Sequence, residues 1–206
     1  MLNTLEKLPE AEITQSLMIH SSRSVALAAL VSFSEIGFHA TTTRHITKRA
    51  SVSAGSLYTH FQSKEDILYF WMREGHRSAR DAVRQAVKRT EDLEERIAAI
   101  VCDLTLWHIR FRTVSQVNTT QVRALSKEHY AEIRKYRREI VELLRSPVNE
   151  GVNQGRFQVP AIDVYLNAVF AIILDVSRWY PRDGALMPES VADGYATFAR
   201  AMLHCG

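Results

Sequence analysis

The sequence predicts an all-α fold, with a three-helix module at the N-terminus and a larger helical domain after it. Two observations carry this prediction. Only five prolines and eight glycines occur in 206 residues, and long segments repeat apolar residues three and four positions apart, which is the period of a helix. Alternation of apolar and polar residues, the pattern of strands, is scarce. No internal repeat or low-complexity tract interrupts the pattern.

Composition limits the class of protein. Hydrophobic residues make up 46% and charged residues 24%, enough for an ordered core, while the net charge of only +3 requires any nucleic-acid surface to be local. Cys102 and Cys205 form neither a metal-binding spacing nor a disulfide framework, which is typical of a reducing compartment. The start lacks a secretory signal, and the longest apolar run, 168–174, is too short for a bilayer. We expect a cytoplasmic protein with no membrane partner.

Residues 1–20 form an N-terminal extension in this interpretation. Lys7 stands against Glu6, Glu10 and Glu12, so the extension is acidic, and a basic arm entering a DNA groove is not expected. A loosely docked helix and a disordered tail both remain open.

The next segment, 21–66, contains three short helices. The first spans 22–36 and ends at Gly37, the second spans about 43–50, and the third about 53–60. Threonines at 41–43 can cap the second helix, and Ser51-Val52 forms a tight turn before the third. Ser63 and Asp66 then begin a helix that runs to about 88. Three helices with a turn between the last two are a helix-turn-helix arrangement.

We expect the remaining residues, 67–206, to form a helical domain for ligand binding and dimerisation. After the helix that ends near 88, further helices are expected at about 93–112, 115–124, 127–153, 160–179 and 188–203. Pro147 should kink the helix over 127–153, and Pro188 fits the first turn of the last helix.

Within 24–68 the sequence resembles the N-terminal module of the TetR family of regulators. The matching features are Ala28-Ala29-Leu30, Phe33, Gly37, the threonine run, Arg44, Ile46, Ala50, Val52-Ser53, Gly55, Leu57-Tyr58, His60-Phe61 and Ser63-Lys64-Glu65. The resemblance implies binding to double-stranded DNA by a two-fold dimer, and therefore a palindromic operator. It implies DNA contacts by Thr42, Thr43, Arg44, Ser53, Ala54, Gly55, Ser56, Tyr58, Thr59, His60 and Lys64.

The third helix has a division of residues that suits this role. Val52, Leu57 and Phe61 form a core-facing set, which leaves polar side chains outside to meet phosphates and base edges. Gly55 permits a close approach of the backbone to DNA, while Tyr58 and Lys64 resemble phosphate anchors. Competing interpretations place Tyr58 in the core, His60 as a packed histidine, and Lys48 with Arg49 on a plain solvated face.

This chain also departs from the family pattern. Ser51 stands where the family usually has glycine, and a serine there is strained if the backbone is left-handed. Thr47 replaces a usual alanine, and Ala54 stands where lysine or arginine is common, which removes a charge from the recognition helix.

The helix over 162–179 is apolar around nearly its whole circumference, so it must be buried on two sides. The last helix has Phe198 and Met202 on one face and several alanines beside them. Together the two helices predict a four-helix interface between two copies of the chain, a homodimer. A thick core within one chain is the competing interpretation.

The helices before this pair predict an effector site. Apolar lining would come from Trp107, Phe111, Tyr136, Ile140 and Phe170. A second resemblance, to TetR regulators of fatty-acid and steroid catabolism that respond to coenzyme A thioesters, rests on 124–126, 150–157 and a Trp179-Tyr180-x-x-x-Gly184 signature. It implies an acyl-coenzyme A effector, whose phosphates would need arginines, from Arg110, Arg112, Arg134, Arg137, Arg178 and Arg182.

Three of these arginines are favoured: Arg134, Arg137 and Arg178. Lys135 with Glu139, and Arg138 with Glu142, stand four apart and are expected to be surface pairs, whereas Arg134 and Arg137 have no such partner.

An enzyme is not expected. The sequence has no His-Glu-x-x-His, no glycine-rich phosphate loop and no Cys-x-x-Cys, and its serines lack a nucleophile-elbow context. We therefore expect no catalytic residue, no cofactor and no metal. The functional hypothesis is a ligand-responsive repressor, released from its operator by a small apolar effector. The alternative is a helical ligand-binding protein that acts independently of DNA.

Overall fold

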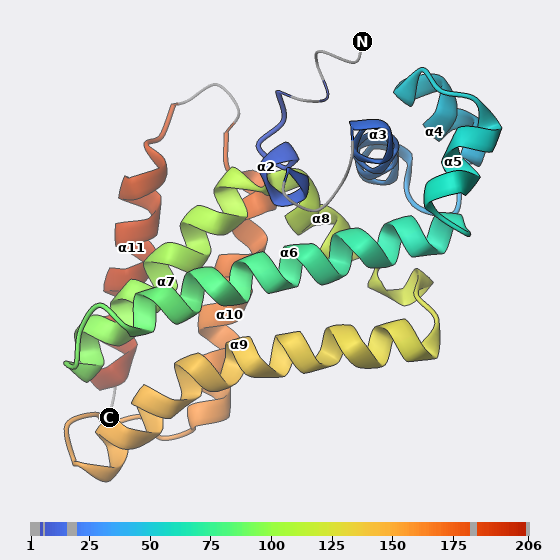
Figure 1. Cartoon of the computed structure of the whole chain (residues 1–206). Coiled ribbons are helices and arrows are strands. Elements are labelled where there is room, and N and C mark those ends of the chain that lie inside the picture. Colours follow the sequence, from blue (N-terminus) through green and yellow to red (C-terminus); the bar gives the residue numbers. More distant parts are fainter. Residues whose placement is uncertain (1–4, 6, 16–19, 182–184, 205–206) are drawn as a thin grey trace. The chain divides into compact units, whose positions relative to one another are not determined.

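A computed structural model describes residues 5, 7–15, 20–181 and 185–204 of the chain. All regular structure in these residues is helical, as Figure 1 shows, so the all-α prediction is confirmed. The chain forms two compact units. Unit 1 comprises residues 1–76 and 113–134, and unit 2 comprises 77–112 and 135–206.

Unit 1 contains the three short helices that the sequence predicts, at nearly the predicted bounds. Its elements are α2 (Ala11–Thr14), α3 (His20–Ile36), α4 (Thr43–Ala50), α5 (Ala54–His60), the first half of α6 (Lys64–Val87), α8 (Arg112–Thr120), η1 (Val122–Ala124) and the start of α9 (Lys127–Asn153).

Side-chain caps explain where these helices begin. The Thr42 hydroxyl accepts a hydrogen bond from the His45 N–H at 3.2 Å, and the His45 ring receives the Thr42 N–H in return. The Ser53 hydroxyl caps α5 through the Ser56 N–H, and Ser63 caps α6 through the Asp66 N–H. These bonds satisfy N–H groups that have no partner within the helix. The predicted caps of α4 and α6 are therefore confirmed.

The core of unit 1 forms where α3, α4, α5 and α6 meet. The Trp71 indole N–H of α6 donates to the Ala26 carbonyl of α3 at 2.7 Å, which satisfies the one polar group of a fully buried side chain. Around it lie fully buried apolar side chains from the four helices, namely Leu27, Leu30, Phe33, Ile46, Leu57, Ile67, Leu68 and Met72. This core sets the positions of the short helices α4 and α5.

The structure corrects the predicted helix over 115–124. Helix α8 begins at Arg112 and ends at Thr120, and the short 3₁₀ helix η1 follows it. Only Phe111 separates α8 from α7 (Leu93–Arg110). Phe111 adopts φ −100° and ψ 49°, so the chain turns at this one residue and becomes helical again at once.

The N-terminal extension is docked where the structure describes it. Leu5, Glu10 and Thr14 are all buried, and α2 contacts α3. The docked-helix interpretation is therefore correct for this part of the extension, while residues 1–4, 6 and 16–19 lie outside the described residues.

Unit 2 is built on α7. Its other elements are the second half of α6, most of α9, α10 (Ile162–Trp179), α11 (Pro188–Ala201) and the 3₁₀ helix η2 (Met202–His204). The alanines of α11, Ala192, Ala196 and Ala199, are buried, and α11 packs closely along α7. These alanines thus pack within the unit, where small side chains let two helices approach. Helix α9 continues through Pro147.

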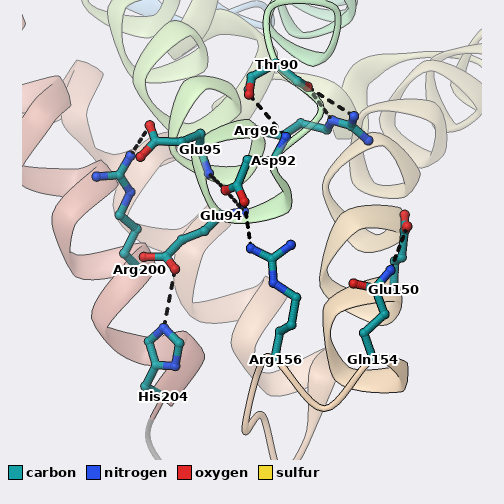
Figure 2. Close-up of polar contacts among 10 residues, drawn as sticks. All are labelled: Thr90, Asp92, Glu94, Glu95, Arg96, Glu150, Gln154, Arg156, Arg200 and His204. Atoms are coloured by element: carbon teal, nitrogen blue, oxygen red, sulfur yellow. Dashed lines mark hydrogen bonds and ion pairs between the residues drawn. The ribbon is translucent and has the colours of Figure 1, made fainter.

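Acidic residues at the start of α7 form ion pairs with arginines after α9 and in α11 (Figure 2). Asp92 caps α7 through the N–H groups of Glu94 and Glu95, and it pairs with Arg156 at 2.6 Å. The hydrogen bond from the Glu95 N–H lowers the pKa of Asp92 below its ordinary value, and the bond from Arg156 lowers it further. Glu95 pairs with Arg200 of α11 at 2.5 Å. The loop after α9 and the end of α11 are therefore anchored to one helix terminus.

The turn between α4 and α5 contains a strained residue. Ser51 ends α4 with φ 56° and ψ 42°, the left-handed conformation that favours glycine. The backbone at Ser51 is therefore left-handed, and the strain expected from the sequence in that case is present. A side chain in this region costs about 1 kcal/mol that glycine avoids.

Ser51→Gly is expected to raise the free energy of unfolding by about 1 kcal/mol, because glycine removes this strain. Urea unfolding followed by circular dichroism would measure the gain. Ser51→Ala is the matched control, since it keeps a Cβ and should give no such gain. Equal stability of the glycine and alanine variants would contradict the strain at this position.

Candidate DNA-binding surface and effector site

Helix α5 presents a polar, exposed face. Tyr58 is 54% exposed, so the interpretation that places it in the core is wrong. The other predicted contacts from this helix are at least partly exposed as well, namely Ser53, Ala54, Gly55, Ser56, Thr59 and His60. Leu57 and Phe61 are buried as expected, whereas Val52 is only half-buried. The predicted division of α5 into a buried and an open side is therefore present, with Val52 as a partial exception.

Nothing within the protein requires glycine at position 55. A Cβ built there would meet only the Ser53 hydroxyl, at 3.9 Å, and Gly55 lies in a regular helix without a left-handed backbone. Glycine lowers helix stability by about 1 kcal/mol relative to alanine. Contacts among the described residues therefore do not account for a glycine at this exposed position.

Helix α4 contributes Thr43, which is half-buried, and Arg44, which is exposed. Thr42 is exposed too, although its hydroxyl already caps the helix. Of the two other basic residues of α4, Lys48 is exposed, whereas Arg49 forms an ion pair with Glu35 of α3. Arg49 therefore has a structural partner, which the sequence did not indicate.

Lys64 supports the loop that precedes α4. Its ammonium group donates to the carbonyl oxygens of Phe38 and Thr41, both at 2.7 Å, and lies 4.3 Å from the centre of the Phe38 ring. Burial lowers the pKa of Lys64 from its ordinary value. An ammonium group has three N–H donors, so these two bonds leave one donor for a phosphate.

The predicted effector residues are mostly interior. Trp107, Phe111 and Ile140 are buried, and the rings of Trp107 and Phe111 lie 5.4 Å apart. The Trp107 indole N–H donates to the Ser78 hydroxyl at 3.0 Å. Tyr136 and Phe170 are half-buried, and the guanidinium carbon of Arg80 lies 5.1 Å from the centre of the Tyr136 ring. Unit 2 thus has an aromatic interior at the predicted helices.

The predicted arginines belong to both units and differ in their partners. Arg178 is exposed and pairs with Asp175 through two bonds of 2.7 and 2.8 Å, and Arg112 donates to the carbonyls of Arg178 and Tyr180. Arg134 is exposed and belongs to unit 1, with its guanidinium carbon 5.9 Å from the centre of the Tyr130 ring. Arg137 is half-buried.

Two candidate arginines remain. The Arg110 guanidinium carbon lies 5.4 Å from the centre of the Phe111 ring, and Arg182 lies outside the described residues, as does Gly184 of the signature.

Unit 2 also contains a cleft of about 290 Å³ that the sequence did not indicate. It is lined by Arg84, Val87, Arg96, Glu139, Glu142, Leu143, Ser146 and Pro147. Glu139 pairs with Arg80 and Arg84, each at 3.3 Å, and Glu142 pairs with Arg145, also at 3.3 Å. These partners differ from the expected Lys135 and Arg138. None of the predicted effector residues lines this cleft.

A group of potential metal ligands lies in unit 1. Ligand atoms of Glu65, Asp66 and His129 lie within 4.8 Å of one another. The Glu65 carboxylate already accepts the Ser126 N–H at 3.0 Å and contacts the His129 Nδ1 atom at 2.7 Å, while Tyr69 stacks on the His129 ring. These contacts tie α6 to the start of α9 and account for the cluster, so we assign no metal to it.

Sequence models of two protein domain families match this chain. The model described as "Bacterial regulatory proteins, tetR family" matches residues 27–69, which span α4 and α5 with most of α3 and the start of α6. The model described as "Tetracyclin repressor-like, C-terminal domain" matches residues 90–203. This chain belongs to the TetR family. It is a transcriptional regulator, and the prediction that it is not an enzyme is confirmed.

Similar proteins share most of the length of this TetR family member. The repressor KstR2 of Mycobacterium tuberculosis is 27% identical and covers 81% of this chain and 84% of its own. A TetR family protein of Rhodococcus RHA1 is 30% identical, with a TM-score of 0.85 over 92% of this chain and all of the other. AibR, solved with isovaleryl coenzyme A and operator DNA, has a TM-score of 0.78 at 22% identity, over 86% of this chain and 97% of its own.

In this TetR family member, helices α10 and α11 carry exposed apolar side chains. Val164 is 67%, Leu174 41% and Phe198 59% exposed. Tyr165, Val169 and Ile173, on the other side of α10, are buried. Among the described residues, none of the helices combines the length and the apolarity needed to cross a bilayer.

Proposed function

We propose that this protein is a repressor whose dimer binds a palindromic operator through α5 and leaves it when a small effector binds to the C-terminal domain. Residues 21–66 would form the DNA-binding domain, and 67–206 the effector and dimerisation domain. The protein would act in the cytoplasm, on DNA near its own gene. Membership of the TetR family supports the regulatory role.

The observation that carries the proposal is the exposed polar side of α5. Tyr58 projects into solvent, and Gly55 occupies a helical position where alanine would fit the protein equally well. Hydroxyl and imidazole groups on such a helix can bind phosphate oxygens and base edges. A protein that only carried a ligand would gain stability by replacing this glycine.

The primary experiment is a binding titration with DNA fragments that flank the protein's own gene, beside a scrambled duplex. Specific retention that weakens steeply with salt supports the repressor, because phosphate contacts release counterions. Ligand binding without preference for any fragment would instead favour the DNA-independent ligand-binding protein.

Tyr58→Ala is expected to weaken binding to every DNA sequence by about tenfold, because a hydrogen bond to a charged phosphate contributes about 1.5 kcal/mol. The slope against salt should stay unchanged, since tyrosine carries no charge. Lys64→Ala should reduce that slope by about 0.9, the value for one lost phosphate contact by a cation. Fluorescence anisotropy over a range of salt concentrations measures both.

Thermal melting must accompany these titrations, because Lys64 also holds the loop at Phe38 and Thr41. If both folded variants bound DNA like the parent at every salt concentration, these two contacts would be wrongly assigned.

Gly55→Leu is expected to separate DNA binding from stability. Leucine is a better helix former than glycine, so the melting temperature should rise slightly, while its side chain should keep the DNA backbone away and lower affinity by at least about tenfold. Ala131→Leu, at an exposed position of α9 outside the predicted contacts, is the matched control for added apolar bulk. Unchanged affinity of Gly55→Leu would argue against a close approach at this residue.

The expected effector is apolar or amphipathic, with an acyl-coenzyme A thioester as the specific proposal. The buried aromatic residues Trp107 and Phe111 support an apolar acyl part. AibR, a structural neighbour, was solved with isovaleryl coenzyme A and operator DNA. The arginines support the thioester less, because Arg178 already pairs with Asp175 and Arg112 already donates to two carbonyls, whereas the phosphates need cations. The cleft adds Arg84 and Arg96, although Glu139 and Glu142 balance their charge.

A DNA-release titration tests the effector. Long-chain, steroid-derived and aromatic acyl-coenzyme A esters would be compared with the free acids, using the operator fragment bound to the full protein. A differential affinity of a few kcal/mol between the DNA-binding state and the released state is sufficient for release. Release by none of the thioesters, or equal release by the free acids, would exclude the coenzyme A proposal and leave DNA binding untouched.

A further inference from the structure

Glu10 is a buried acid in the N-terminal extension. Its side chain is 1% exposed, although a carboxylate is almost never buried without a partner. One partner lies far along the chain, because the Thr113 N–H donates to the Glu10 Oε1 atom at 2.8 Å. Thr113 is in the first turn of α8. The extension therefore places a negative charge at a helix N-terminus, where the helix dipole favours it.

Helix α8 needs such an external partner because its own sequence supplies no cap. Phe111 lies directly before α8 and has no side-chain oxygen that could accept an N–H. The first N–H groups of a helix have no acceptor within the helix. The Glu10 carboxylate satisfies one of them across 103 positions of sequence.

Residues around Glu10 fix the extension in this place. Leu5 is 8% and Thr14 0% exposed, and the Gln15 carbonyl accepts a hydrogen bond from Arg23 of α3 at 3.2 Å. We define residues 7–15 as the N-terminal strap. The strap is bound to α3 at one end and to α8 through Glu10.

Helix α8 in turn supports the DNA-binding helices of unit 1. A Cβ at Gly75 of α6 would lie 2.5 Å from the Val114 side chain, so α8 packs tightly against α6. Just beyond α8, the Gln121 side-chain carbonyl accepts the Phe38 N–H at 3.0 Å. Phe38 begins the loop to α4, the same loop that Lys64 holds. A shift of α8 would therefore move the Gln121 side chain, which binds that loop at Phe38.

We propose that Glu10 is a positioning residue for DNA binding, because the strap fixes α8 and α8 fixes the loop that leads to α4. The inference rests on the proposed DNA-binding function. Loss of the Glu10 carboxylate frees the first turn of α8 and lets the α4 and α5 pair leave its productive position. The strap contacts no DNA in this scheme and acts only through α8.

The test uses the full-length protein with Glu10→Ala and Glu10→Gln. Gln keeps an acceptor oxygen but loses the charge, so the effects should rise from Gln to Ala. Amide hydrogen exchange at Thr113 and its neighbours should accelerate about tenfold in the alanine variant, and affinity for the operator duplex should fall about tenfold, as loss of a charge-assisted hydrogen bond predicts. The slope of affinity against salt should stay unchanged, because no phosphate contact is lost.

Glu12→Gln is the matched control, since Glu12 is an exposed acid in the same strap. It should leave both exchange and affinity at parental values. Operator binding that stays parental in the Glu10 variants, despite faster exchange, would reduce Glu10 to a local helix cap and overturn the proposal. Unchanged exchange would overturn it as well.

The two proposals can fail separately. If the parent binds no DNA, the repressor function fails, and exchange at Thr113 still shows whether the strap fixes α8. If Glu10→Ala does not fold, Glu10→Gln supplies the measurement. In Glu10→Gln, amide exchange should then be faster than in the parent by less than tenfold, and operator affinity should be lower by less than tenfold. Parental values for both quantities would reject the role of Glu10.

Discussion

Phe198→Asp is expected to convert the protein from a dimer into a monomer and to weaken operator binding by roughly 10²–10⁴-fold, the range over which linking two binding modules raises affinity. Phe198 is 59% exposed on α11. A charge there should be harmless in a single copy, because the side chain has water around it. In an interface between two copies the same charge loses its hydration without gaining a partner.

Sedimentation at micromolar concentration and anisotropy with the operator duplex measure the two effects. Circular dichroism should show that the variant keeps its helices and that only assembly is lost. Ile36→Asp is the matched control, since Ile36 is an apolar side chain with 49% exposure at the end of α3. The control should remain a dimer.

A parent that is already monomeric at this concentration would contradict the interface, and so would a dimeric Phe198→Asp. The exposed residues Val164 and Leu174 of α10 give the prediction its basis, because they leave an apolar surface on the two helices that the sequence assigned to dimerisation. Their buried neighbours already form the core of unit 2. The remaining apolar side is most simply covered by a second copy.

Gly151→Ala is expected to lower the free energy of unfolding by about 3 kcal/mol, at the upper end for added volume in a packed core. A Cβ at Gly151 would lie 2.0 Å from the Phe157 Cδ2 atom, and Phe157 is only 4% exposed. The gain in helix propensity, about 1 kcal/mol, is too small to offset this overlap. Thermal and urea unfolding measure the loss.

A double-mutant cycle with Phe157→Ala identifies the cause. Phe157→Ala alone should cost about 3–5 kcal/mol, since it empties a core position. In that background the added methyl group of Gly151→Ala has room, so it should cost nothing further and raise helix propensity instead. Additive losses would show that the clash with Phe157 is not the reason.

Local sequence determined the helices and several of their ends. The helix over 127–153 was predicted at its observed bounds, because its apolar residues recur with the helical period for seven turns and Lys127 follows a serine that can begin it. Thr42 and Ser63 could be identified as caps since the groups they bind lie three residues away. The family resemblance and the exposed side of α5 depended on the same short-range patterns.

Contacts between distant residues were decided by the tertiary structure alone. The sequence placed α8 three residues too late, because its cap is Glu10, which lies 103 positions earlier. Lys64 was interpreted as a phosphate anchor, yet two of its donors bind carbonyls 23 and 26 positions upstream. Glu139 was paired with a neighbour on its own helix, whereas Arg80 and Arg84 of α6 reach it.

The physical reason is the range of each interaction. Backbone dihedrals, helix propensity and capping depend on residues within about one turn, so a sequence pattern reports them directly. A charged side chain binds whichever partner the fold brings within a few ångströms, and neither periodicity nor spacing shows which one that is. The sequence could therefore establish the helices and the recognition element, while the partners of Glu10, Lys64 and Glu139 followed only from the packed chain.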